Sequence, residues 1–251
     1  MNIAVVRALE ILRLVGNSEE PMSLTDISKS LDIPKTTAFN IINTLVKEKC
    51  LYVKDSRSKL YEIGIGIYEI GSLYFNKIEY RSIVREVIKT IRDTLSTASF
   101  FCIADNDELI YLDKAEPSGV VKTSIRIGRR MPMYSSSLGK IILAYYNEDE
   151  LEGYLGRVEL ESKTCNTITD KNKLKLELQK DRRNGYSISD EENDPGLYCV
   201  AAPIFNDEGK PFASISASFV KMNINDEVVE EAKKMVVEQA QKISRVLGYR
   251  K

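Results

Sequence analysis

Apolar residues recur every three or four positions in three stretches near the start of the chain, and this spacing is typical of amphipathic helices. The first stretch covers residues 3–16 and ends at Gly16-Asn17. The second begins at Ser23, whose hydroxyl is placed to cap a helix that has Asp26 at its third position. The third begins near Pro34, since a first helical turn does not use the N–H that proline lacks. We therefore expect a longer helix followed by two short helices joined by a tight turn.

Two short β patterns follow these helices, at residues 51–53 and 60–63. Residues 55–58 separate them and have the composition of a turn. A further helix over residues 67–76 is expected to connect the two halves of the chain. Helix, turn, helix and two-stranded ribbon are the parts of a winged helix-turn-helix. We assign residues 1–64 to such a domain and residues 65–77 to a linker helix.

The remainder, residues 78–251, mixes both kinds of pattern. Helical spacing occurs at residues 84–95, 138–145, 170–183 and 229–247, and strand patterns occur at 100–103, 109–112, 120–125, 197–204 and 212–219. Helices combined with an antiparallel sheet place this domain in the α+β class. The last strand alternates, with Ser214, Ser216 and Ser218 on one face. This serine face either lines a pocket, or lies in solvent, or is bonded to neighbouring backbone.

Composition excludes several classes of function. Hydrophobic residues make up 43% of the 251 residues, and the net charge is 36 − 37 = −1, so neither disorder nor a uniformly basic coat fits. The chain has no histidine, which excludes a Ser-His-Asp triad and His-ligated metals. Its four cysteines, 34 or more residues apart, form no CxxC motif. We expect no metal and no cofactor. No apolar run reaches the roughly 18 residues of a membrane span, and a signal peptide is not recognisable, which favours the cytoplasm.

The outer face of the third helix carries side chains suited to reading DNA. A helix that enters the major groove needs small polar or basic side chains on its exposed face. Asn40 could pair with adenine through two hydrogen bonds, and Lys35 could contact a phosphate. The full set of predicted DNA-binding residues is Ser23, Lys35, Thr36, Thr37, Asn40, Asn43, Arg57 and Lys59. The alternative is that these residues only solvate a surface helix.

Several blocks of the chain carry a resemblance to one family. They are residues 23–51 with Tyr61-Glu62-Ile63-Gly64 and Gly71, residues 128–144, residues 183–187, Asp190-Glu191-Glu192 and residues 196–204. Together they resemble the IclR family of bacterial transcription regulators. The resemblance implies a GAF-like second domain that binds a small metabolite, often a carboxylate or an aromatic acid. Many members carry arginine where this chain has Asn40, and several carry an acid where it has Ser189.

The resemblance also implies which residues bind the effector. Carried over position by position, they are Thr123, Met131, Ser137, Leu138, Ser189, Leu197, Cys199, Ser216 and Ser218. For two further charged features we expect no role in binding or catalysis. We expect Lys140 to lie at the surface or in a domain contact, and the run Asp190-Glu191-Glu192 to be solvated.

We therefore expect an effector-controlled, DNA-binding transcriptional regulator, acting as a repressor and not as an enzyme. Its expected partners are double-stranded DNA with a roughly palindromic operator, a small-molecule effector, and further copies of itself in a homodimer or tetramer. One alternative is a GAF-type thiol enzyme with an accessory winged helix. Another is a protein-interaction module whose winged helix binds a partner protein.

Overall fold

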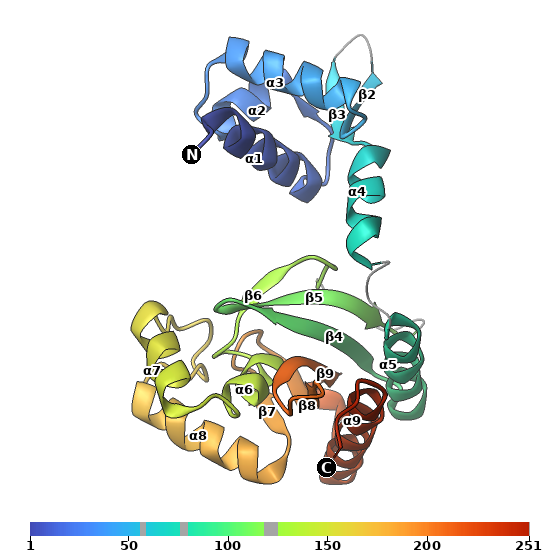
Figure 1. The fold of residues 1–251 in the computed structure, drawn as a ribbon, viewed down its shortest axis with the longest axis vertical. Coiled ribbons are helices and arrows are strands. Elements are labelled where there is room, and N and C mark those ends of the chain that lie inside the picture. The colour runs from blue at the N-terminus through green and yellow to red at the C-terminus, as the bar shows by residue number, and fades with distance from the viewer. Residues whose placement is uncertain (56–58, 76–79, 118–124, 251) are drawn as a thin grey trace. The chain divides into compact units, whose positions relative to one another are not determined.

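Two units make up the computed structural model, Met1–Glu79 and Tyr80–Lys251 (Figure 1). The structure describes residues 1–55, 59–75, 80–117 and 125–250. The boundary between the units places the predicted linker helix with the N-terminal unit.

The first unit is a winged helix. Its elements are α1 (Ile3–Asn17), β1 (Met22–Ser23), α2 (Leu24–Ser30), α3 (Lys35–Lys47), β2 (Leu51–Asp55), β3 (Leu60–Ile63) and α4 (Ile65–Phe75). The strands form one antiparallel sheet in the order β1-β3-β2. Ile11 of α1, Ile27 of α2 and Ile42 of α3 meet in a core from which water is excluded. The predicted helix-turn-helix and two-stranded ribbon are confirmed, and β1 is an addition too short for any alternation to predict.

The turn between α2 and α3 is held by a pair of hydrogen bonds. The Ser28 hydroxyl donates to the carbonyl of Ile33 at 2.6 Å, and the Ile33 N–H donates to the carbonyl of Ser28 at 3.1 Å. Asp32 between them adopts a left-handed φ of 50°, a conformation that aspartate tolerates better than most residues. These bonds fix the direction in which α3 leaves the turn.

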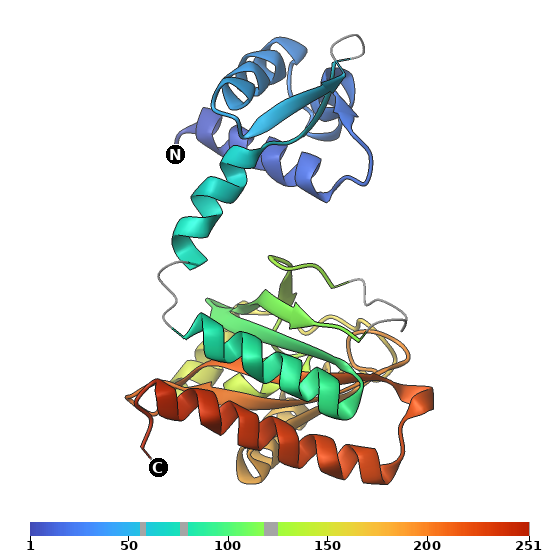
Figure 2. The ribbon, with the colours of Figure 1, turned by 90° about the vertical axis from the view of Figure 1, so that its right-hand side faces the viewer.

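The second unit is built on a six-stranded sheet in the order β6-β5-β4-β9-β8-β7. Its strands are β4 (Ala98–Asp105), β5 (Glu108–Ala115), β6 (Arg130–Pro132), β7 (Ser187–Asp190), β8 (Leu197–Phe205) and β9 (Pro211–Val220), and every neighbouring pair is antiparallel. Helices α5 (Arg81–Leu95) and α9 (Asp226–Val246) lie side by side against one face (Figure 2). On the other side are α6 (Ser137–Leu143), α7 (Glu148–Arg157) and α8 (Lys171–Asn184). The predicted α+β class is confirmed.

Because helices cover both faces of the sheet, both sides of the central strand β9 are buried. Ser214 and Ser216 have no exposed surface, and Ser218 retains 8%. The interpretation that this serine face lies in solvent is therefore wrong. All seven residues of α6 are buried as well.

Helix α7 and the short strands β6 and β7 of this unit were not expected. Helix α7 carries three acidic residues in its first turn. It also contains two glycines, and their low helix propensity made a helix hard to predict from the sequence. Strand β7 has only four residues at the sheet edge. The predicted strand over residues 120–125 lies almost entirely outside the described residues. In the part of the chain that the structure covers, no helix is both long and apolar enough to cross a membrane.

Candidate functional site

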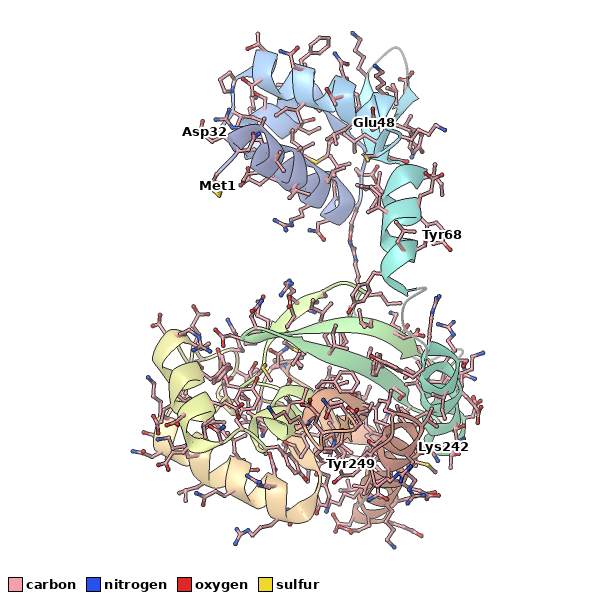
Figure 3. The ribbon with its side chains drawn as sticks, viewed as in Figure 1. Met1, Asp32, Glu48, Tyr68, Lys242 and Tyr249 are labelled. Carbon is pink, nitrogen blue, oxygen red and sulfur yellow. The ribbon has the colours of Figure 1, made fainter. Side chains whose placement is uncertain are left out.

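Helix α3 has a buried face and an exposed polar face. Ala38, Ile42 and Leu45 face the core. The predicted reading residues lie on the outer side: Lys35, Thr36, Asn40 and Asn43 are exposed, and Thr37 is half-buried. The labelled residues Asp32 and Glu48 lie just before and just after this helix (Figure 3). The polar face therefore runs along the length of the helix.

Ser23 occupies the start of α2, where its hydroxyl is already engaged. It accepts a hydrogen bond from the Asp26 N–H at 3.2 Å, and it donates to the Asp26 carboxylate at 2.6 Å. The Ser23 backbone N–H also donates to the Asp26 carboxylate, at 3.3 Å, which completes the predicted capping box. The hydrogen bonds that the Ser23 side chain and backbone donate lower the pKa of Asp26. The structure thus shows a structural use for the Ser23 side chain.

The ribbon contributes a smaller basic surface than its sequence suggests. Lys54 pairs with Glu62 at 2.5 Å, and Glu62 also accepts a hydrogen bond from Tyr52. Lys59 is exposed at the start of the returning strand. Arg57 lies outside the described residues, and its predicted role stays a prediction.

A pocket in the second unit brings most of the predicted effector residues together. Seven of the nine line it: Met131, Ser137, Leu138, Ser189, Leu197, Cys199 and Ser218. The pocket also includes residues that sequence reasoning missed, namely Tyr111, Ile125, Ser136, Asn193 and Asp194. Its cavity measures about 30 Å³, which is room for about two water molecules. A larger effector would therefore displace lining side chains.

The pocket wall combines apolar side chains with polar groups. Ser137 and Ser189 line the pocket and are more than 90% buried as residues, and the structure gives neither hydroxyl a hydrogen bond to another described residue. Asp194 accepts a hydrogen bond from the Asn193 amide at 2.6 Å. The Asn193 carbonyl oxygen in turn accepts one from the Ser135 hydroxyl at 3.1 Å. Hydroxyl, amide and carboxylate groups that converge on one cavity suit a polar ligand.

Of the two remaining predicted effector residues, the structure describes only Ser216. Ser216 is buried beside the pocket without lining it, and its hydroxyl oxygen is 3.4 Å from that of Ser218. Its neighbour Ser214 donates to the carbonyl of Leu138 at 2.9 Å, so the serine face points toward α6. Thr123 lies outside the described residues.

Buried Cys102 and half-buried Cys199 are poorly suited to nucleophilic chemistry. Removal from water raises the pKa of Cys199 to about 11, although a hydrogen bond with Ser218 partly opposes this. Burial also raises the pKa of Cys102 well above its usual range. Because the thiolate is the reactive form, both thiols stay protonated near neutral pH. The geometry gives no support to a thiol mechanism at these two residues.

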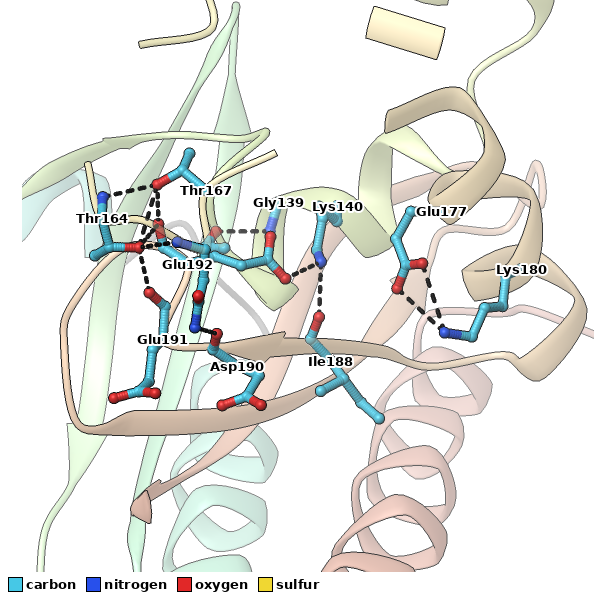
Figure 4. A network of polar contacts seen from close by, with 12 residues as sticks. Gly139, Lys140, Thr164, Thr167, Glu177, Lys180, Ile188, Asp190, Glu191 and Glu192 are labelled. Carbon is cyan, nitrogen blue, oxygen red and sulfur yellow. Dashed lines mark hydrogen bonds and ion pairs between the residues drawn. The ribbon is translucent and has the colours of Figure 1, made fainter. Parts of the chain in front are cut away.

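A buried ionic network holds the segment that carries Asn193 and Asp194 (Figure 4). The ammonium of Lys140 lies 2.5 Å from the Glu192 carboxylate and donates to the carbonyl of Ile188 at 2.7 Å. The Thr167 hydroxyl donates to the carbonyl of Glu192 at 2.6 Å. The side chains of Lys140 and Thr167 therefore hold the backbone of the segment next to the pocket.

This network corrects two expectations. Lys140 was expected at the surface or in a domain contact, but it has no exposed surface. The acidic run was expected to be solvated, but Glu192 is buried, and Asp190 and Glu191 both pair with Lys221 at 2.7 and 2.6 Å. The reason is that the fold brings these carboxylates to lysines at least 30 residues away in the sequence.

Comparisons with known proteins agree with this architecture. The family model described as "IclR helix-turn-helix domain" matches residues 4–54, and "Bacterial transcriptional regulator IclR C-terminal" matches residues 72–245. The chain is 28% identical to the transcriptional regulator XynR of Escherichia coli, covering 98% of this chain and 97% of XynR. It is 29% identical to KdgR of the same organism, covering 98% and 93%. The crystal structure of the Thermotoga maritima IclR is 33% identical over 98% of each chain, with a TM-score of 0.83.

Proposed function

Because the chain belongs to the IclR family of bacterial transcriptional regulators, we propose that α3 reads an operator and that the pocket residues bind the molecule controlling it. The protein is an effector-controlled, DNA-binding regulator. We propose repression as its mode of action, since the relatives AllR of Salmonella typhi and AllR of Escherichia coli are named transcriptional repressors. The relatives are regulators, and catalysis is not part of the proposal.

The exposed polar face of α3 is the observation that carries the DNA-reading role. In a helix-turn-helix, the second helix enters the major groove, and α3 is that helix here. Asn40 would read adenine through two hydrogen bonds, Lys35 would contact a phosphate, and Thr36, Thr37 and Asn43 would contact the backbone or base edges. Arg57 and Lys59 of the ribbon would contact phosphates or the minor groove.

A salt titration of operator binding tests this role. Affinity for the protein's own promoter should fall steeply as salt rises, with a log–log slope of about −0.9 for each phosphate contacted. A slope near zero would instead favour the rival reading, in which the winged helix binds a protein. A footprint that covers two half-sites one helical turn apart would support a dimer on a palindrome.

Exposed apolar side chains on α1 and α4 support self-association. On α4, Ile65, Tyr68, Ile70 and Leu73 are each at least 61% exposed, and Figure 3 labels Tyr68 on this helix. On α1, Ile3 and Val5 are more than half exposed. Apolar surface of this kind marks association sites. We propose that these helices contribute to a homodimer, which further contacts could extend to a tetramer; sedimentation equilibrium measures the state.

For the effector we propose a small carboxylic acid, with aromatic acids included. An IclR homologue from Microbacterium hydrocarbonoxydans, 21% identical, is described in complex with 4-hydroxybenzoate. The hydroxyls of Ser137 and Ser189 can donate to a carboxylate. Mass spectrometry of small molecules that co-purify with the chain would test this class directly.

A further inference from the structure

Asp194 places a carboxylate in the wall of the effector pocket. It was not among the residues predicted to bind the effector. One of its oxygens accepts a hydrogen bond from Asn193, at 2.6 Å. A carboxylate has about four lone-pair positions, so Asp194 keeps capacity to accept further hydrogen bonds. The backbone beneath it is held by the Lys140–Glu192 pair two residues earlier.

The charge of Asp194 is felt by other groups of the pocket. Burial is the main cause of the raised pKa values of Cys199 and Tyr111, and the negative charge of Asp194 raises both further. Among the described residues that line the pocket, none is a lysine or an arginine. The positive charge of Arg129 acts on Tyr111 in the opposite sense, from outside the pocket lining. Any acid in this pocket would therefore place its carboxylate near a like charge, and a ligand hydroxyl that donates to Asp194 would offset this repulsion.

The same wall holds donors apart from Asp194. The Ser137 hydroxyl lies at the start of α6, and the Ser189 hydroxyl lies on β7. Both residues line the pocket and are more than 90% buried, and the structure shows no hydrogen bond from either hydroxyl to another described residue. The pocket thus offers donors on two elements and one charged acceptor on a third segment. A ligand that satisfies all three must itself carry both an acceptor and a donor.

We infer that the effector is a hydroxy acid, whose carboxylate accepts hydrogen bonds from Ser137 and Ser189 and whose hydroxyl donates to Asp194. This inference rests on the proposed function, because it assigns a ligand class to the same pocket. Asp194 is then the residue that selects hydroxylated acids over acids without a hydroxyl. Discrimination of this kind is strong when a buried polar group would otherwise lose its partner.

Isothermal titration calorimetry with two matched pairs of acids tests the inference. The pairs are glycolate with acetate, and 4-hydroxybenzoate with benzoate, so that a small and an aromatic body are both sampled. The full-length chain is compared with Asp194→Asn and with Asp207→Asn, a control that removes a carboxylate from the exposed turn between β8 and β9. Circular dichroism and thermal melting confirm that each variant is folded.

The wild-type chain should bind the hydroxylated member of at least one pair about tenfold more tightly, as expected for a hydrogen bond to a charged group. Asp194→Asn should weaken binding of the hydroxy acid and strengthen binding of its plain counterpart, because the like charge is removed. Asp207→Asn should leave both affinities unchanged. A purely structural role for Asp194 would instead shift both members of a pair in the same direction.

Three results would overturn the inference. The first is equal affinity of the wild-type chain for both members of each pair. The second is a shift of both affinities in the same direction in Asp194→Asn. Either result removes Asp194 as the selecting residue but leaves the proposal of an acid effector intact. If none of the four acids binds the wild-type chain, the hydroxy-acid class falls together with the proposed acid effector. Operator binding and its salt dependence are measured separately and are unaffected by either result.

Discussion

The Lys140 ammonium and the Glu192 carboxylate form an ion pair at 2.5 Å inside the second unit, and the lysine side chain has no contact with solvent. The pair joins α6 to the segment between β7 and β8, which also carries Asn193 and Asp194. A buried charge without its partner is strongly unfavourable. Removing only one member of the pair should therefore lower the free energy of unfolding strongly, because the other charge is then left buried without a partner.

Lys140→Met should lower the free energy of unfolding by about 3 kcal/mol, because Glu192 is then left buried and unpaired. Urea denaturation of the full chain measures this as an earlier transition of the second unit. The double variant Lys140→Met/Glu192→Leu should recover much of the loss. Lys180→Met removes a lysine from an exposed pair with Glu177 and should change stability by less than about 1 kcal/mol. Equal effects of Lys140→Met and Lys180→Met would contradict the interpretation.

Asp181 predicts a pH dependence of stability. Burial raises its pKa from 3.8 to about 7, although Ser187 and Lys140 partly oppose the shift and Glu177 and Glu192 add to it. Because the folded pKa lies above the unfolded one, the folded state holds the proton more tightly, and stability falls as pH rises from about 4 to about 7. Asp181→Asn removes this penalty of at most about 4 kcal/mol.

Urea unfolding at pH 5 and pH 8 checks the sign. The stability gain of Asp181→Asn over the wild-type chain should be larger at pH 8 than at pH 5. Asp207→Asn, in an exposed turn, should show no such difference. A gain that does not depend on pH would mean that Asp181 does not titrate in this range.

Gly139 permits α6 to approach the backbone of residue 133. A Cβ built at Gly139 would lie 2.2 Å from the carbonyl oxygen of Met133, a distance that no rearrangement of a flexible side chain can relieve. Gly139→Ala should therefore destabilise the second unit by about 1–3 kcal/mol. Gly156→Ala in α7 is the matched control: nothing lies within 4 Å of its added Cβ, so the better helix propensity of alanine should leave the melting temperature unchanged or higher.

Asn40→Ala should reduce affinity for the cognate operator by about 1–3 kcal/mol, because a bidentate contact to a base edge is lost. Binding to unrelated DNA should change little. Lys35→Ala should weaken binding to all sequences and reduce the salt slope by about 0.9. Electrophoretic mobility shifts at several salt concentrations measure both effects. Lys173→Ala, which removes an exposed lysine from α8, should alter neither.

The sequence predicted best what depends on near neighbours. Helical spacing located α3 and α5, and Ser23 with Asp26 marked the start of α2, because these signals act within a few residues. The nine predicted effector residues came from family resemblance, and the structure brings seven of them together around one pocket.

Long-range partners could not be predicted in the same way. Nothing near Lys140 in the sequence indicates that Glu192, 52 residues later, neutralises it in the core. Asp194 lies in a short Asn-Asp-Pro-Gly segment that reads as an ordinary turn, and only the folding of β7 against β8 brings it to the pocket. Burial of both faces of β9 likewise depends on helices from distant parts of the chain.

Helix α6 has no side that faces water, and its first two residues form part of the pocket wall. A surface helix can tilt into solvent when a ligand pushes on it, but a helix enclosed by close-packed atoms has no such freedom. An effector that displaces Ser137 or Leu138 must therefore move the Met133 backbone and the β9 serines as well. Binding of an effector in this small cavity would thus shift side chains and backbone throughout the interior of the second unit, not only in a single loop.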